Sequence, residues 1–302
     1  MCSDPPRVAV LLAAYNGMSW LEEQLETLQK QIAVAISIFI SVDISTDGTE
    51  AWCTTYAQRH ANTTLLAPAG PFGAAAANFF RLIRDVDFSG FDYVAFSDQD
   101  DLWYPDKLHR AVSTLKSSDH DAYSSNVIAF WPNGRRQLLN KAQPQVRWDY
   151  LFEAAGPGCT YFITRRLANA LKASVRAQWD LVKRIDLHDW YCYAFARTHG
   201  FRWFIDPVPG LDYRQHDHNQ IGANTGLASF EARFDRIMDN WWPEQVMLIR
   251  HLAGNGPMLT GKKSKRLWFL GLIPKAAQCR RRTRDKFLFV IVCLVIALKR
   301  QA

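Results

Sequence analysis

This 302-residue sequence lacks the segments by which secreted and membrane-spanning proteins are recognised. Residues 1–7 contain no apolar core like that of a secretion signal. The apolar run Phe287–Leu298 has 12 residues. As a helix it extends only about 18 Å, against a hydrocarbon core of about 30 Å. The six cysteines include no Cys-x-x-Cys pair. We therefore expect a body in the reducing cytosol with free thiols and no spanning helix.

The sequence also lacks the glycine-rich signatures of two large enzyme classes. It has neither the G-x-x-x-x-G-K-[ST] loop of P-loop enzymes nor the G-x-G-x-x-G of dinucleotide-binding dehydrogenases. Neither internal repeats nor low-complexity stretches are visible in it. A composition of 48% hydrophobic and 22% charged residues excludes a disordered chain and a long coiled coil. The length suffices for one large or two modest domains with a real core.

Acidic residues are scarce at the C-terminal end. Residues 262–302 hold 12 Lys or Arg and one acid, Asp285, for a charge of +11, whereas residues 1–261 hold 24 bases and 28 acids, for −4. The net positive charge therefore comes from residues 262–302, which argues against nucleic-acid binding by residues 1–261. We expect the basic, apolar tail to bind an anionic membrane surface, peripherally or monotopically, at the cytoplasmic face of the inner membrane. The alternative is a C-terminal helix buried against the body.

The first two-thirds of the chain alternate short β-rich runs with helical patterns. Strands are expected at Arg7–Ala14, Ser37–Asp43, Thr63–Ala67, Asp92–Ser97, Cys159–Thr164 and Phe201–Asp206. Helices are expected at Trp20–Gln31, with Ser19 and Glu22 as a capping box, and at Asp106–Leu115, Arg165–Leu171, His188–Arg197 and Leu227–Ala253. Such alternation predicts an α/β fold with a mainly parallel sheet. We expect one domain over residues 1–225, with halves of about 1–120 and 121–225, followed by a helical extension over 226–302.

Polar clusters follow three of the predicted strands. They are Ala14–Gly17, Asp43–Thr49 and Ser97–Asp101. Because ligands of such folds bind beyond the carboxyl ends of the strands, we expect the three clusters to form one site.

Two carboxylates in the third cluster have the spacing of a metal site. Asp98 and Asp100 are two residues apart at a strand end, so both are expected on one face, where they would suit Mg²⁺ or Mn²⁺. The alternative is a solvated acidic loop. His216 could complete the metal sphere, or contact a diphosphate beside Arg214. A zinc site at His216 and His218 lacks a third ligand at suitable spacing.

Other polar residues could bind a nucleoside and activate a hydroxyl. Tyr15 offers an aromatic face, Asn16 an amide, and Asp43 an acceptor for a base imide or a ribose. Asp47 fits a plain turn equally well. Asp189, at a predicted helix start, is the candidate general base, and the alternative is an N-cap that satisfies backbone amides.

The ordered motifs resemble glycosyltransferase family 2, with the GT-A fold. They are VLLAAYNG (10–17), SVDISTDGT (41–49), DQDDLW (98–103), LHDW (187–190) and YRQHDHNQIG (213–222). The likeness spans about residues 7–225 and is greatest to the bacterial rhamnosyltransferase-like branch that builds surface polysaccharides such as O-antigen. The chain departs from the common D-D-G-S-T-D-G-T pattern, because residues 42–49 lack one acid and one glycine.

The resemblance implies roles for individual residues. The nucleotide-sugar is expected at Tyr15, Asn16, Asp43, Asn78, Asp98 and Arg214, and a divalent metal at Asp98, Asp100 and His216. Asp189 is expected to act as the base.

The resemblance also implies a reaction. It is a metal-dependent inverting transfer of a sugar, such as rhamnose from dTDP-rhamnose, from a nucleotide-diphospho-sugar to a hydroxyl of a lipid-linked glycan or saccharide acceptor. Two alternatives stay open at this point. One is a sugar-phosphate nucleotidyltransferase, and the other is a catalytically silent, membrane-bound nucleotide-binding scaffold.

Overall fold

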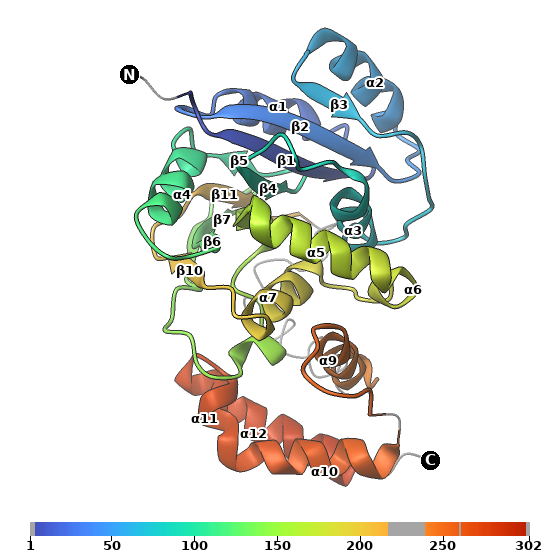
Figure 1. Cartoon of the computed structure of the whole chain (residues 1–302), viewed down its shortest axis with the longest axis vertical. Coiled ribbons are helices and arrows are strands. Elements are labelled where there is room, and N and C mark those ends of the chain that lie inside the picture. The colour runs from blue at the N-terminus through green and yellow to red at the C-terminus, as the bar shows by residue number, and fades with distance from the viewer. Residues whose placement is uncertain (1–3, 217–238, 260, 300–302) are drawn as a thin grey trace.

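A computed structural model describes residues 4–216, 239–259 and 261–299. Its upper part in Figure 1 is a twisted sheet with helices on both faces, and its lower part is a layer of helices. The main sheet has seven strands in the order β10-β6-β9-β4-β1-β2-β3. Its members are β1 (Arg7–Ala14), β2 (Ala35–Val42), β3 (Thr63–Leu65), β4 (Tyr93–Ser97), β6 (Ala122–Ser125), β9 (Phe162–Thr164) and β10 (Trp203–Asp206).

The apolar run of β1 explains its position in the sheet. Seven of its eight residues are buried, and it pairs in parallel with β2 on one side and β4 on the other. Each fully buried Val or Leu side chain contributes about 1.5–3 kcal/mol, so the strand with the longest buried run is favoured in the interior. The predicted mainly parallel α/β sheet is confirmed. Its antiparallel member is β9, which pairs with both β4 and β6.

Helices connect and cover the strands. They are α1 (Leu21–Gln29), α2 (Thr49–Arg59), α3 (Ala75–Asp85), α4 (Lys107–Lys116), α5 (Arg165–Ala177), α6 (Trp179–Val182) and α7 (His188–Thr198). A second sheet, in the order β5-β11-β7-β8, contains β5 (Leu102–Trp103), β7 (Val127–Phe130), β8 (Arg136–Leu139) and β11 (Leu211–Arg214).

Local predictions were wrong at two places. The Ser19–Glu22 capping box does not form, because α1 begins after Trp20 without a side-chain cap. The expected strand over residues 159–164 begins instead with a 3-10 turn, Gly158–Thr160, and only β9 is extended. Of the expected helix over 227–253, the described part is α9 (Trp241–Leu252), and residues 227–238 lie outside the described residues.

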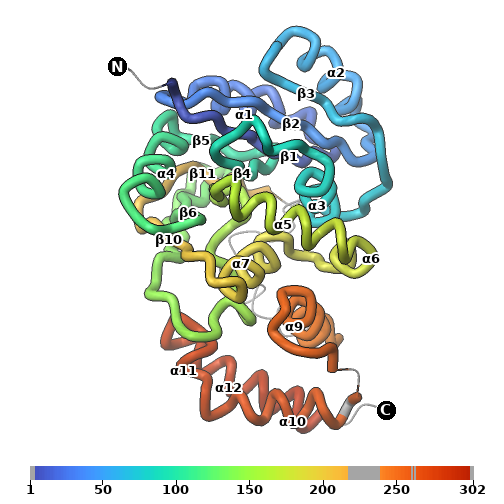
Figure 2. The backbone as a smooth tube through the Cα atoms, in the orientation of Figure 1, coloured from blue at the N-terminus to red at the C-terminus, as the bar shows by residue number. Residues whose placement is uncertain are grey.

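The C-terminal helices pack on the body. They are α10 (Lys262–Leu272), α11 (Ala276–Cys279) and α12 (Thr283–Leu298), and they form the lowest layer in Figures 1 and 2. Phe289 and Cys293 of α12 are buried in the same core as strand β1, and the Phe289 ring lies 4.7 Å from that of Phe152. The alternative of a helix packed on the body is therefore correct for one face of α12.

The other face of α12 stays apolar and exposed. Phe287, Ile291, Leu294 and Leu298 are 40–75% exposed and recur at helical spacing. Leu267 and Leu270 of α10 are exposed as well. Among the described helices, none has the length and apolar character needed to cross a membrane.

One charge prediction needs correction. The arginines at 280–284 were expected to face a membrane, but Arg281 is only 6% exposed. Its backbone N–H donates to Glu153 Oε1, and its guanidinium donates to the Ala154 carbonyl. Arg280 donates to the Phe152 carbonyl at 2.7 Å. Carboxylates and free carbonyls in the body attract these two cations, whereas Arg284 remains 70% exposed.

Candidate active site

The loops that follow β1 and β2 are joined by hydrogen bonds at one edge of the sheet. Asn16 donates its backbone N–H to Ser45 Oγ at 3.0 Å and accepts the Thr46 N–H at 2.9 Å. Gly17 N–H donates to Thr49 Oγ1 at 2.8 Å. These contacts confirm that two of the predicted polar clusters meet.

Asp47 stabilises the junction between these two loops. Its carboxylate accepts hydrogen bonds from the Met18 backbone and from both the backbone and the hydroxyl of Thr49. Although burial opposes ionisation, these hydrogen bonds lower the pKa of Asp47. Asp47 is therefore more than a plain turn residue, since it ties the second loop to the first.

The loop after β4 joins the same edge through Gln99, a residue that the sequence did not single out. Its side-chain amide accepts the Tyr15 N–H at 2.8 Å and donates to the Tyr15 carbonyl at 2.9 Å. A Cβ on Gly17 would lie 2.4 Å from Gln99 Oε1, so the amide fits because position 17 has no side chain. This pairing leaves the Tyr15 ring 56% exposed and free to offer its face. Because the paired residues are 84 apart in sequence, no local pattern could reveal the contact.

Two of the predicted donor-binding side chains are engaged within the fold. Both carboxylate oxygens of Asp43 accept backbone N–H groups, from Ile44, Phe72 and Gly73. Asn78 is 2% exposed, and its amide bonds to Ser41 and to the Ala14 carbonyl. Asn78 therefore joins β1, β2 and α3, and its expected contact with the donor stays a prediction.

Acidic side chains are concentrated after β4. Asp98, Asp101 and Cys159 bring one ligand atom each within 4.8 Å of one another. Burial raises the pKa of Asp98 to about 7, and the charges of Asp100 and Asp189 add to the rise. Burial likewise holds the pKa of the Cys159 thiol well above its usual range, so it stays protonated and is a poor ligand.

The residue set fits a divalent cation. Asp100 Oδ2 and His216 Nε2 lie 2.7 Å apart, and two atoms this close can share one ion. Asp101 Oδ2 is buried without a hydrogen-bond partner among the described residues. A dication would offset the excess negative charge that raises the pKa of Asp98. The predicted metal residues are thus divided, with Asp100 facing His216 and Asp98 beside Asp101 and Cys159.

His216 and Arg214 approach the acids from the second sheet. The His216 ring stacks on Trp20 with the ring centroids 4.2 Å apart. Arg214 donates to the Asp100 carbonyl at 2.9 Å and to Glu23 at 2.5 Å. Trp20 and Glu23 carried no distinguishing signal in the sequence. Glu23 therefore engages one guanidinium nitrogen of Arg214.

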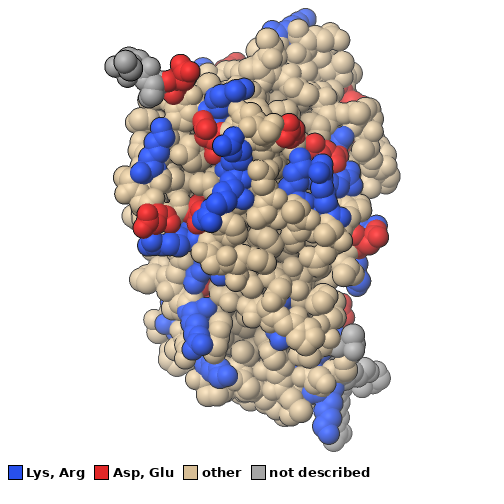
Figure 3. Space-filling view, in the orientation of Figure 1, with Lys and Arg blue, Asp and Glu red and all other residues tan. Residues whose placement is uncertain are grey.

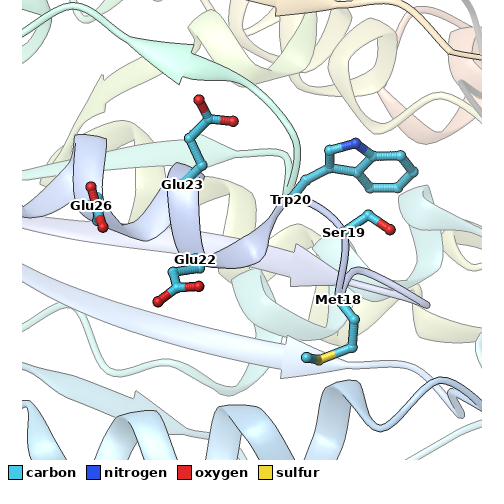
Figure 4. A pocket seen from close by; sticks show the side chains of 6 residues that line it. All are labelled: Met18, Ser19, Trp20, Glu22, Glu23 and Glu26. Carbon is cyan, nitrogen blue, oxygen red and sulfur yellow. The ribbon is translucent and has the colours of Figure 1, made fainter.

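A hollow beside this region is lined by Met18, Ser19, Trp20, Glu22, Glu23 and Glu26 and measures about 260 Å³ (Figure 4). Its three glutamates project from α1. Because their negative charges oppose a diphosphate, this hollow is not the donor site.

Asp189 comes from the second half of the chain and begins α7. It accepts the Trp190 N–H at 2.7 Å, while the N-cap position belongs to Leu187. Burial raises the pKa of Asp189 to about 6, although the Trp190 hydrogen bond and the charge of Lys141 oppose the rise. A Cβ on Gly158 would lie 3.4 Å from Asp189 Cβ, and the next residue, Cys159, has its thiol within 4.8 Å of an Asp98 oxygen. The fold therefore brings the predicted base to the predicted metal site.

Gly158, in the 3-10 turn before β9, leaves space for the side chains of His188 and Asp189. A Cβ on Gly158 would lie 2.4 Å from His188 Nε2 and 3.4 Å from Asp189 Cβ. The His188 ring stacks on Phe79 at 4.0 Å, and burial lowers the pKa of His188 to about 3, so it is neutral. His188 thus packs beneath Asp189 without adding charge to the site.

Comparison with known proteins adds to this geometry. The family model described as glycosyl transferase family 2 matches residues 9–167, which is more than half of the chain. The chain belongs to glycosyltransferase family 2. The β1, β2 and β4 loops described above lie within the matched segment, and the chain is a glycosyltransferase.

Relatives extend the match over the whole chain. The chain is 40% identical to the dTDP-rhamnosyl transferase RfbG of Shigella flexneri over 289 residues, covering 94% of this chain and 99% of that protein. It is 29% identical to the putative glycosyltransferase EpsE of Bacillus subtilis (strain 168) over 115 residues, 38% of this chain and 40% of EpsE. Among solved structures, S. aureus TarS 1-349 in complex with UDP-GlcNAc has a TM-score of 0.55 at 11% identity. The likeness covers 96% of this chain and 90% of that chain, and it confirms the GT-A-like fold alone.

Proposed function

We propose that this glycosyltransferase moves rhamnose from dTDP-rhamnose to a hydroxyl of a lipid-linked saccharide, with inversion at the anomeric carbon. The observation that carries the proposal is that Gly158 and Cys159 contact Asp189 on one side and the acids after β4 on the other, in a chain 40% identical to a dTDP-rhamnosyl transferase over nearly its full length. An acceptor hydroxyl bound between them would have a base on one side and the leaving diphosphate on the other.

Asp189 supplies the base in this proposal. Its pKa of about 6 leaves the carboxylate ionised at neutral pH yet basic enough to take a proton as the hydroxyl attacks. The neutral His188 beneath it and the start of α7 hold its position. Attack on the face opposite the diphosphate would invert the anomeric configuration.

The donor would lie along the edge formed by the loops after β1, β2 and β4. The exposed Tyr15 ring can stack on the thymine ring of the donor, and Asn16 and Asp43 border the same edge of the sheet. Asp98, Asp100 and His216 would hold Mn²⁺ or Mg²⁺. When bound, such an ion would neutralise the charge that develops on the leaving diphosphate.

Acceptor and membrane complete the proposal. The exposed apolar stripe of α12 and the basic side chains at the lower end of the molecule in Figure 3 are complementary to an anionic lipid surface. If α10 and α12 lay in such a surface, they would bring a lipid-linked acceptor toward the catalytic domain.

Calorimetry and a transfer assay test the proposal together. We expect dTDP to bind more tightly than UDP or GDP, and Mn²⁺ to strengthen its binding. Asp189→Asn should retain dTDP binding and lower transfer by about 10²–10⁴-fold. Asp180→Asn, which changes an exposed carboxylate on α6, is the matched control and should be unaffected. Full transfer by Asp189→Asn would remove Asp189 from the role, and preference for another nucleotide would reject dTDP-rhamnose.

A further inference from the structure

Four cationic side chains gather on the side of Asp189 that faces the C-terminal helices. Lys141 follows β8, and Arg280, Arg281 and Arg282 connect α11 to α12. Arg280 and Arg281 donate to the carbonyls of Phe152 and Ala154, and a Cβ on Gly156, two residues further on, would lie 3.8 Å from Lys141 Cβ. Like charges this close repel one another, so an anion bound among them would be stabilised.

Buried donors in this cluster have no acceptor among the described residues. They are Arg280 Nε, Arg281 Nε and Arg281 Nη1. Arg281 is only 6% exposed. Its Nε lies 3.4 Å from Glu153 Oε1 and 3.7 Å from Asp149 Oδ2 without forming a hydrogen bond to either. Unsatisfied guanidinium donors at such burial are costly, so an additional acceptor would be favourable there.

The acids that face the cluster are fewer than its cations. Asp149 and Glu153 lie beside Arg281, and Asp285 lies 3.7 Å from Arg280. Asp149 also pairs with Arg197, and Asp285 with Arg284. In the part of the chain that the structure describes, the side chains of Lys141 and Arg282 form neither a hydrogen bond nor an ion pair. Both are partly exposed and within reach of a ligand.

The cluster lies next to the proposed base. A Cβ on Gly156 would lie 3.8 Å from Lys141 Cβ, and Gly158, two residues later, borders Asp189. The Arg281 guanidinium lies 5.9 Å from the ring of Tyr193, which is one turn beyond Asp189 on α7. The exposed apolar stripe of α12 begins at Phe287, five residues after Arg282.

We propose that Lys141, Arg280, Arg281 and Arg282 bind a phosphate group on the acceptor side of the active site. Arginine donors in this arrangement suit phosphate oxygens, and the neighbouring apolar stripe suits a ligand whose phosphate carries an apolar chain. The phosphate belongs either to the lipid-linked acceptor or to a headgroup of the surrounding bilayer. The assignment to the acceptor side rests on the proposed role of Asp189, whereas phosphate binding itself does not.

Calorimetry on the full chain in neutral detergent tests the site without any transfer. The probes are farnesyl diphosphate, farnesol, and nanodiscs with and without phosphatidylglycerol. We expect farnesyl diphosphate to bind at least tenfold more tightly than farnesol. The double variant Lys141→Gln/Arg282→Gln should lose this preference, and the control Lys275→Gln/Arg284→Gln should keep it. Asp100→Asn should also keep it, which separates this site from the donor site.

The outcomes distinguish the phosphate sources and the two proposals. Loss of farnesyl diphosphate binding in the Lys141/Arg282 variant assigns the site to the acceptor. Loss confined to phosphatidylglycerol nanodiscs assigns it to the headgroup. Equal binding by wild type and this variant, with unchanged melting temperatures, overturns the inference. If transfer from dTDP-rhamnose fails while the variant still loses phosphate binding, the proposed function is wrong and this site stands.

Discussion

Asp189 shows how one residue acquires its properties from three different segments. The start of α7 provides its backbone, Gly158 leaves space for it, and Cys159 after Gly158 lies beside the acids that follow β4. Its raised pKa results mainly from burial, and the nearby Lys141 limits the rise. A base with these properties is half ionised near pH 6 and fully ionised at pH 8.

The pH dependence of transfer should report this carboxyl. Protonation removes the base, so the single-turnover rate should rise about tenfold per pH unit below pH 6 and level off above it. Rapid-quench measurements at saturating donor and acceptor would reveal the acidic limb. A rate that stays constant from pH 5 to pH 8 would contradict the assignment.

Gly158 should be intolerant of any side chain. In Gly158→Ala the new Cβ would meet His188 Nε2 at 2.4 Å, which must displace His188 and with it Asp189. We expect a lower melting temperature and at least a tenfold loss of kcat. Gly271→Ala is the matched control, because it lies within α10 with nothing within 4 Å. It should leave activity unchanged and stabilise the helix by about 0.5–1 kcal/mol.

At the scale of elements, the segment between α11 and α12 attaches the C-terminal layer to the catalytic domain. Arg280 and Arg281 hold the backbone of residues 152–154 and meet Asp149 and Glu153. The same stretch continues to Gly158, which borders His188 and Asp189. A short, continuous piece of chain therefore links the C-terminal helices to the surroundings of Asp189.

Breaking this attachment should destabilise the protein. Arg281→Met leaves the fully buried Asp149 and the nearby Glu153 without one of their cations, a loss of about 3 kcal/mol for a buried pair. Thermal unfolding should shift down by several degrees. Arg284→Met, which changes a 70% exposed side chain, should shift it by less than a degree. Equal shifts in the two variants would show that Arg281 does not hold the layers together.

At the scale of the whole molecule, charge and apolar surface are separated along its length. Residues 1–261 carry a net charge of −4, whereas residues 262–302 carry +11 and include the exposed apolar stripe of α12. The lower end of the face seen in Figure 3 shows basic side chains on an otherwise neutral surface. This distribution would orient the molecule with its catalytic domain away from an anionic bilayer.

Vesicle sedimentation tests that orientation. The protein should bind vesicles containing phosphatidylglycerol, and binding should weaken as salt rises because the attraction is partly electrostatic. Phe287→Ser/Ile291→Ser should lower the bound fraction severalfold. Ile32→Ser/Leu138→Ser replaces apolar residues elsewhere that are 51% and 49% exposed, and it should not lower the bound fraction. Binding that is indifferent to the α12 variant would reject α12 as the contact.

Buried runs such as β1 and the polar residues after them are local patterns, so the interior strands, the mainly parallel sheet and the strand-end motifs could be predicted from the sequence, whereas the strands of the second sheet could not. The sequence also indicated the family, through five short motifs in a fixed order. Only the tertiary structure decided which side chains meet. Gln99 pairs with Tyr15 across 84 positions, Trp20 stacks on His216, and Arg281 is buried against Asp149. Such contacts depend on packing between distant segments. The basic run at residues 280–284, which the sequence predicts to be exposed, can therefore include an arginine that is buried beside the active site.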